Sequence, residues 1–250
     1  MSRYWSRYWA AFNASEIYID SMSKPYKLIV FDWDGTLMDS EARIVNCIHA
    51  AARDVGLPSL ERSAIRNIIG LGLREAIDSL YPGSDESVHR ALTDRYRHHF
   101  LGDEPTPSTL FPGSAQTVEN LHEAGYLLAV ATGKGRSGLD LVLEETGLGH
   151  FFLVTRCADE TFSKPHPQML EEVMAWAGVE PGETLMIGDT EYDMQMATNA
   201  RTDALAVSYG VHARERLLQH DPVGCIDSIG ELEGWLERIT VGDRTTKSQG

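Results

Sequence analysis

Three aspartates stand directly after short apolar runs of this sequence. Asp32 and Asp34 are two residues apart and follow the run at 27–31, and Asp189 follows the run at 184–187. Converging carboxylates repel one another unless a cation joins them, and hard oxygen ligands that leave room for water suit Mg²⁺. We therefore expect the three side chains to meet around Mg²⁺, with a phosphate dianion completing its coordination.

The same region holds residue types that phosphoryl transfer needs. A carboxylate is a competent in-line nucleophile, and Asp32, first after its apolar run, is the predicted one. Asp34 can protonate the leaving oxygen and later take a proton from water. Lys164 and the Thr132 hydroxyl can hold the non-bridging oxygens, where charge accumulates, and backbone N–H groups near Gly133 add donors. This set predicts hydrolysis of small phosphate monoesters through an aspartyl-phosphate.

The apolar runs that precede these residues alternate with helical patterns. The runs lie at 27–31, 127–131, 151–154, 184–187 and 204–207, and helical patterns at 114–124, 137–145, 167–177 and 193–200. Such alternation with short connections predicts a doubly wound, Rossmann-like α/β core, in which helices cover both faces of a parallel sheet. Ligands bind such sheets at the carboxyl ends of the strands, which is where the polar residues stand.

A stretch from 41 to 104 interrupts this alternation. Its apolar residues recur at helical spacing, and glycines and prolines divide it into several helices without a convincing strand. We predict an inserted all-α cap domain at 41–104 and a catalytic core made of 24–40 and 105–238. Residues 1–23, which include the repeat SRYWSRYW, are predicted to form a disordered extension, and 239–250 a frayed tail.

Taken in order, four of these signals resemble the motifs of the haloacid dehalogenase superfamily. They read FDWDGTL at 31–37, Thr-Gly at 132–133, Ser-Lys-Pro at 163–165 and Gly-Asp-Thr-x-x-Asp at 188–193. The helical insert between the first two is similar to that of the phosphoglycolate-phosphatase-like branch, which carries an α-helical cap. The resemblance runs from about 24 to about 235, and the four-motif set is highly specific.

The resemblance implies a role for each matching residue. Asp32 would be the nucleophile and Asp34 the general acid and base. Thr132 and Lys164 would be phosphate ligands. The Mg²⁺ ligands would be Asp32, Asp189 and the backbone carbonyl of Asp34, and Asp193 would support the metal site through water or through Lys164. Aspartate at position 34 fits phosphate transfer rather than dehalogenation.

Some positions leave alternatives open. Arg74 is the candidate for binding an anionic substrate tail by a bidentate contact, or else it is exposed and pairs with solvent or a neighbour. Lys134 and Arg136 either contact phosphate or are solvated. Arg201 stands where family members often place glycine after a helix, which predicts an altered C-cap.

Charge and hydrophobicity limit the partners. A formal net charge of −15 repels nucleic acid and anionic lipid, so neither is an expected partner, and a small phosphorylated metabolite is. The sequence lacks the apolar core of a signal peptide and any run long enough to span a bilayer, which favours a cytoplasmic protein. We expect a monomer or a homodimer.

Two other enzyme classes compete with the phosphatase. The segment 133–138 fits the dinucleotide-binding pattern GxGxxG, and Asp159 lies at the distance of a ribose ligand, which would indicate an oxidoreductase. That interpretation leaves the three aspartates and Lys164 unexplained. A phosphomutase of the same fold would pass the phosphoryl group to a sugar hydroxyl, but the insert has no recognisable sugar-phosphate reader, so hydrolysis is preferred. A non-catalytic module is disfavoured because every proposed catalytic position is present.

Overall fold

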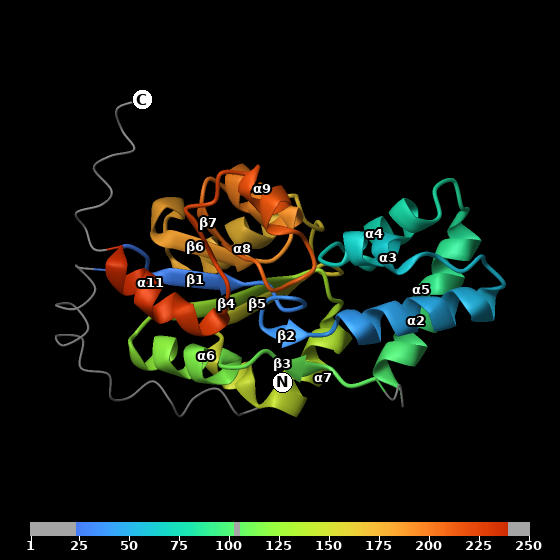
Figure 1. The fold of residues 1–250 in the computed structure, drawn as a ribbon, viewed down its shortest axis with the longest axis horizontal. Helices are drawn as coiled ribbons and strands as arrows, with labels where there is room; N and C mark the ends of the chain where they lie inside the picture. Colours follow the sequence, from blue (N-terminus) through green and yellow to red (C-terminus); the bar gives the residue numbers. More distant parts are fainter. Residues whose placement is uncertain (1–23, 103–105, 240–250) are drawn as a thin grey trace.

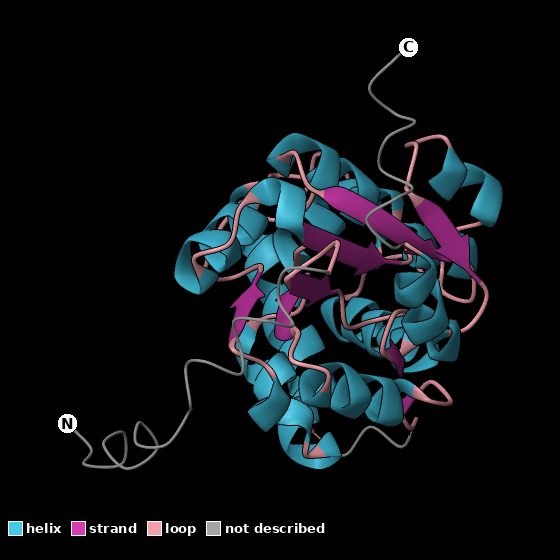
Figure 2. Ribbon diagram, turned by 90° about the vertical axis from the view of Figure 1, so that its left-hand side faces the viewer, coloured by secondary structure: helices cyan, strands magenta, loops and turns pink. Residues whose placement is uncertain are grey.

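A computed structural model describes residues 24–102 and 106–239, so the predictions for 1–23 and 240–250 lie outside the described residues. Six parallel strands form the central sheet in the order β5-β4-β1-β6-β7-β8. Helices cover both faces of this sheet (Figures 1 and 2). The predicted doubly wound α/β architecture is confirmed.

The strands and their helices alternate along the chain. The strands are β1 (Leu28–Phe31), β4 (Leu127–Thr132), β5 (Val154–Cys157), β6 (Thr184–Gly188), β7 (Asp203–Val207) and β8 (Gly224–Ile226). The helices are α6 (Ser114–Glu123), α7 (Arg136–Thr146), α8 (Gln168–Ala177), α9 (Glu191–Ala200), α10 (Arg214–Leu218) and α11 (Leu232–Arg238).

Two strands of the central sheet differ from the prediction. The apolar run at 151–154 is not a strand, because Leu148–Phe151 forms a 3₁₀-helix and β5 begins only at Val154. The short strand β8 was not predicted, because three residues that include Gly224 carry too little apolar pattern to be recognised.

Burial on both faces explains why β1 reads as a continuous apolar run. Leu28 and Val30 belong to the cluster under α8 and α9, whereas Ile29 and Phe31 belong to the cluster under α6, α7 and α11. Successive side chains of a strand point to opposite faces, so a strand covered on both faces needs apolar residues throughout. All four side chains are fully buried, which fixes β1 at the centre of the molecule.

Four helices lie between the short antiparallel strands β2 (Met38–Asp39) and β3 (Thr109–Leu110). They are α2 (Glu41–Val55), α3 (Arg62–Ile68), α4 (Leu73–Leu80) and α5 (Glu86–Leu101), and we call them the cap. The cap has its own apolar cluster, which includes Ile44, Ile65 and Phe100. In Figure 1 it projects from the end of the sheet where β1 terminates.

Local signals set the ends of the cap helices. Gly56 ends α2 in the left-handed conformation with φ 75°, and the Asp85 side chain begins α5 by accepting hydrogen bonds from the N–H groups of Ser87 and Val88. None of the helices in the described ranges combines the length and the hydrophobicity that crossing a membrane requires.

Candidate active site

Strand register brings the sequence motifs to one edge of the sheet. The central strand β1 lies between β4 and β6. Phe31, the last residue of β1, pairs with Val130 of β4 and with Ile187 of β6. Thr132 and Asp189 each follow two residues after these partners. Asp32 therefore stands between the ends of both neighbouring strands. The predicted convergence of Asp32, Thr132 and Asp189 at the carboxyl edge follows from this register.

Three buried carboxylates meet there, and a lysine joins two of them. Oxygens of Asp32, Asp189 and Asp193 lie within 4.8 Å of one another, and all three residues are fully buried. The Nζ atom of Lys164 lies 2.8 Å from Asp32 Oδ1 and 2.6 Å from Asp193 Oδ1. Lys164, an isolated residue in the sequence, is thus part of the cluster.

The two oxygens of Asp32 have different surroundings. Oδ1 accepts a hydrogen bond from the Trp33 N–H at 2.7 Å, in addition to its contact with Lys164. Oδ2 is buried and has no hydrogen-bond partner among the described residues. A buried anionic oxygen without a partner is costly, so Oδ2 is the atom of this site that most needs a ligand.

The Asp189 carboxylate is held from two sides. Thr36 Oγ1 donates to its Oδ1 at 2.9 Å, and the Val211 N–H donates to its Oδ2 at 2.8 Å. Gly35 passes so close that any side chain there would collide with this carboxylate, and its φ of 81° also favours glycine. Val211 was not predicted from the sequence, because a backbone donor in the loop after β7 carries no side-chain signal.

Asp193 is fixed by the start of α9. Its Oδ2 accepts hydrogen bonds from the Thr190 N–H at 3.0 Å and from Thr190 Oγ1 at 2.6 Å, which together with the reciprocal bond to the Asp193 N–H form a capping box. The remaining oxygen faces Lys164. Asp193 therefore reaches Asp32 through Lys164, the second of the two routes that the resemblance implied.

The electrostatics of the cluster favour an additional cation. Burial raises the pKa of Asp32 well above its usual range; Lys164 opposes this, while Asp193 and Asp189 add to it. Burial and the Asp193 carboxylate raise the pKa of Asp189 to about 7. Burial alone would lower the pKa of Lys164, but Asp193 and Asp32 outweigh it and raise that pKa to about 12. One ammonium thus faces three carboxylates, and hard oxygen donors with an orphaned Oδ2 fit Mg²⁺.

Asp34 lies outside this cluster and faces the cap. Its Oδ1 accepts a hydrogen bond from Ser40 Oγ and lies 2.9 Å from Lys134 Nζ. Lys134 is itself buried, and its ammonium lies 4.3 Å from the centre of the Phe100 ring. The lysine is therefore paired with the carboxylate of Asp34 rather than solvated, and contact of its ammonium with phosphate stays a prediction.

The loop after β4 touches the cap directly. Thr132 is buried, and its Oγ1 accepts a hydrogen bond from the Lys134 N–H at 3.2 Å. A Cβ atom on Gly133 would lie 2.5 Å from the carbonyl oxygens of Gly70 and Leu71. The cap segment 70–72 therefore closes over the edge of the sheet only because position 133 has no side chain.

Comparison with known proteins agrees with this arrangement. The family model of the haloacid dehalogenase-like hydrolases matches residues 29–207. The chain belongs to this family. Its four motifs and its helical cap are those that the sequence resemblance indicated, and the family assignment makes it a hydrolase rather than an oxidoreductase.

Relatives of this haloacid dehalogenase-like hydrolase are phosphatases by name. "Probable phosphatase IndB" of Dickeya dadantii is 35% identical over 213 residues, which cover 83% of this chain and 92% of the relative. A phosphoglycolate phosphatase of Vibrio cholerae is 32% identical, and the alignment covers 84% of this chain and 96% of the relative. A crystal structure described as a predicted phosphoglycolate phosphatase from Haemophilus somnus matches with a TM-score of 0.75 at 25% identity, covering 84% of this chain and 98% of that one. The protein is a phosphoric monoester hydrolase.

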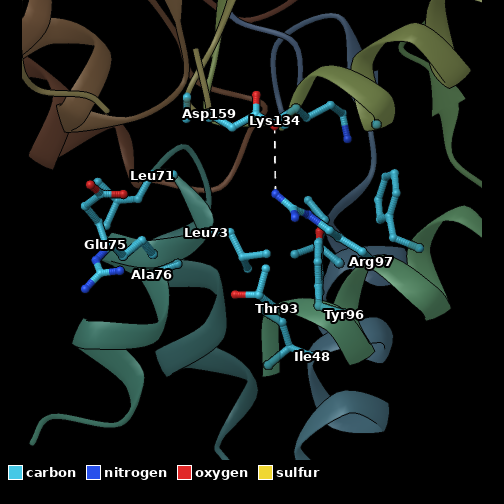
Figure 3. Close-up of a pocket in the computed structure, with 18 of the residues that line it drawn as sticks. Ile48, Leu71, Leu73, Glu75, Ala76, Thr93, Tyr96, Arg97, Lys134 and Asp159 are labelled. Carbon is cyan, nitrogen blue, oxygen red and sulfur yellow. Dashed lines mark ion pairs between the residues drawn. The ribbon is translucent and has the colours of Figure 1, made fainter. Parts of the chain in front are cut away.

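A cavity of about 500 Å³ in the hydrolase opens between the cap and the core. Asp34, Gly133 and Lys134 line its core end, and side chains of α2, α4 and α5 line the rest. Figure 3 shows Leu73 and Tyr96 of the cap in this space, below Lys134. A concave site that combines apolar side chains with charged and polar groups is typical of a small-molecule site.

Arg74 lines the same cavity of the hydrolase, but its side chain is 64% exposed and pairs with Glu86 at 3.0 Å. The structure does not bring it to the aspartate cluster. Arg136 is also occupied, with Glu160 Oε2 at 2.7 Å. Asp159, the ribose ligand of the oxidoreductase hypothesis, instead accepts a hydrogen bond from the Arg136 N–H at the first turn of α7.

Proposed function

We propose that this hydrolase is a Mg²⁺-dependent phosphatase that hydrolyses small phosphate monoesters through an aspartyl-phosphate on Asp32. The observation that carries the proposal is the state of Asp32, whose Oδ1 is held by Lys164 while its buried Oδ2 has no hydrogen bond among the described residues. A buried carboxylate held in one orientation suits in-line attack, and its unpartnered oxygen is open to a ligand.

The residues present fit a magnesium ion, and Asp32, Asp189 and the backbone carbonyl of Asp34 are the proposed ligands. Asp193 supports them by holding Lys164 at 2.6 Å. When bound, the ion would neutralise the crowded carboxylates and the phosphate dianion. Lys164 and Thr132, with the N–H groups around Gly133, are the proposed ligands of the non-bridging phosphate oxygens.

Asp34 is the proposed general acid and base. In the first step an oxygen of Asp32 bonds to phosphorus, the bond to the leaving alcohol breaks, and Asp34 gives its proton to the departing oxygen. In the second step Asp34 takes a proton from water, the water oxygen bonds to phosphorus, and the bond to Asp32 breaks. Ser40 and Lys134 hold the Asp34 carboxylate for both steps.

The substrate class follows from the relatives only in outline. Two of the relatives are named phosphoglycolate phosphatase and pyrophosphatase. Phosphoglycolate and pyrophosphate therefore belong in a test panel with sugar phosphates and nucleotides. Phosphate release measured with Mg²⁺ and with chelator tests the metal, and analysis of sugar products separates hydrolysis from phosphoryl transfer to another hydroxyl.

Asp32→Asn is the decisive variant, with Asp39→Asn on the exposed face of β2 as its control. We expect Asp32→Asn to keep the fold and to lower kcat by at least about a thousandfold, because removing a nucleophile removes the covalent route. Acid-quenched wild-type protein should carry phosphate on the peptide that contains Asp32. Turnover by Asp32→Asn at the wild-type rate, with deamidation excluded, would refute the proposal.

A further inference from the structure

Apolar side chains of the cap form one continuous part of the cavity wall. Ile48 of α2, Leu73 and Ala76 of α4 and Tyr96 of α5 line it beyond the polar end formed by Asp34. In Figure 3 these cap side chains surround the space below Lys134. A leaving group bound beside Asp34 would therefore meet hydrocarbon, which favours an apolar body.

The cavity has no free cation in its interior for an acidic substrate tail. The lining residues Lys134, Arg97, Arg74 and His89 are paired among the described residues, with Asp34, Asp159 (3.8 Å), Glu86 and Asp78 (3.1 Å) respectively. Arg90, which also lines the cavity, is exposed. Glu75 and Asp94 add carboxylates to the same lining. A carboxylate bound there would lose its hydration without gaining an unpaired buried cation as a partner.

The size of the cavity also exceeds what a two-carbon acid needs. Its volume is about 500 Å³, and because a water molecule occupies about 30 Å³, it would hold on the order of 15 waters. A glycolate unit would displace few of them. A larger apolar body would displace most, and this release is what stabilises binding in an apolar site.

The hydroxyl groups of Tyr96 and Thr93 lie among the apolar side chains of the wall. Tyr96 has no hydrogen-bond partner for its hydroxyl among the described residues, and Figure 3 shows this group directed toward the end of the cavity where Lys134 lies. Burial, with Asp34 and Cys47 contributing, raises the pKa of Tyr96 well above its usual value, so this hydroxyl stays uncharged. Thr93 lies one helical turn away on the same helix and also lines the cavity.

We propose that the cavity selects phosphate monoesters of neutral alcohols with a bulky, largely apolar body, and that phosphoglycolate is a poor substrate by comparison. The inference rests on the proposed function, because the phosphate of either substrate occupies the site around Asp32. Tyr96 and Thr93 supply the polar contacts that orient the body, and Ile48, Leu73 and Ala76 supply the apolar surface.

The test compares kcat/KM of the wild-type protein, with Mg²⁺, for 2-phenylethyl phosphate, ethyl phosphate and phosphoglycolate. All three are esters of alcohols, so the comparison isolates the body of the leaving group. We expect 2-phenylethyl phosphate to exceed both others by at least about tenfold, the discrimination that burying a few carbon atoms supplies. Equal values, or phosphoglycolate as the best of the three, would overturn the inference.

A charge variant tests the same wall. Thr93→Lys places an ammonium in the cavity from a position that is already polar and half-buried, and Thr198→Lys on the exposed side of α9 adds the same charge elsewhere. We expect Thr93→Lys alone to raise the ratio of phosphoglycolate to 2-phenylethyl phosphate hydrolysis by about tenfold or more. An unchanged ratio in a folded Thr93→Lys protein contradicts the assignment; if that variant does not fold, the wild-type ranking decides.

Failure of the inference and failure of the proposed function give different results. Absence of phosphate release from every ester in the presence of Mg²⁺ overturns the proposed function and the inference with it. Phosphorylation of Asp32 together with a preference for phosphoglycolate overturns only the inference.

Discussion

Lys134 links the proposed general acid to the cap. Its ammonium lies 2.9 Å from Asp34 Oδ1 and 4.3 Å from the Phe100 ring of α5. A buried ammonium that contacts both a carboxylate and an aromatic face is held in one orientation. Lys134 is therefore a positioning residue for Asp34, and Phe100 makes that position depend on the cap.

Replacing Lys134 by methionine tests this role. Lys134→Met keeps a side chain that packs on Phe100 but removes the charge that orients Asp34. We expect kcat to fall by about 10- to 100-fold with a smaller change in KM, since misplacing a general acid costs about this much. Steady-state kinetics measure both constants. Lys27→Met is the control and should leave kcat unchanged, because the Lys27 side chain is 45% exposed and pairs with Glu183 at the surface.

At the scale of elements, Arg201 shows that the C-cap of α9 keeps its geometry without glycine. The residue adopts the left-handed conformation with φ 61°, and its N–H bonds the carbonyls of Ala197 and Thr198. The altered cap that the sequence predicted is therefore a change of residue with the usual backbone. A residue with a Cβ atom is strained in this conformation.

Arg201→Gly should stabilise the protein. Glycine removes about 1–2 kcal/mol of left-handed strain but loses about 0.5–1 kcal/mol of backbone entropy, so the free energy of unfolding should rise by about 0.5–1 kcal/mol. Denaturant unfolding measures this change. Arg201→Ala keeps the Cβ atom and should give no gain; equal stabilisation by both variants would show that the backbone conformation is not the cause.

The cap segment 70–72 is the second element whose placement matters. Its carbonyls approach Gly133, and the Gly72 N–H donates to Ser163 Oγ at 2.7 Å. These contacts join the cap to two loops that carry proposed phosphate ligands, Gly133 itself and Lys164 beside Ser163. With these contacts made, the cap segment covers the proposed phosphate site, which would keep water from it.

Gly133→Ala should separate the cap from the core. The new Cβ atom would lie 2.5 Å from two backbone carbonyls, which must move apart. We expect kcat/KM to fall at least about tenfold, because small displacements of positioning groups are costly to catalysis. Gly149→Ala, whose Cβ would lie 3.6 Å from Leu143 Cβ, is the control. Wild-type kcat/KM in Gly133→Ala would mean that this contact has no part in turnover.

At the scale of the whole molecule, stability is linked to the charge of the site. The pKa of Asp189 in the folded protein is about 7, whereas an aspartate in an unfolded chain titrates near about 4. Between these values the folded protein keeps a proton that the unfolded chain has released. The contribution of Asp189 to the free energy of unfolding of the metal-free protein should therefore fall as pH rises from about 4 to about 7, by at most about 1.4 kcal/mol per pH unit, and level off above.

Thermal unfolding of the wild type and of Asp189→Asn, each with chelator and with Mg²⁺, checks this linkage. His212, whose pKa is lowered by burial, acts in the opposite direction below about pH 6.5, but it does so in both proteins and cancels in their difference. We expect a steeper loss of stability between pH 5 and pH 7 in the wild type, and a larger gain from Mg²⁺ at pH 8 than at pH 5. Identical pH slopes in the two proteins would contradict the assignment.

The sequence by itself determined the order of the main elements and the residues that are proposed to carry the chemistry. Apolar runs followed by Asp32, Thr132 and Asp189 were enough, because a parallel sheet places the carboxyl ends of its strands at one edge. It did not locate β5 or β8, where the apolar pattern was shifted or short.

Only the tertiary structure decided which charges pair. Lys164 reaches Asp32 and Asp193, Lys134 reaches Asp34 rather than solvent, and Arg74 pairs with Glu86 at the rim of the cavity. Long side chains choose partners by the distances that folding creates between segments far apart in the chain, and spacing along the sequence does not contain those distances. The same reason hid the apolar character of the cavity, which arises only when α2, α4 and α5 face the edge of the sheet together.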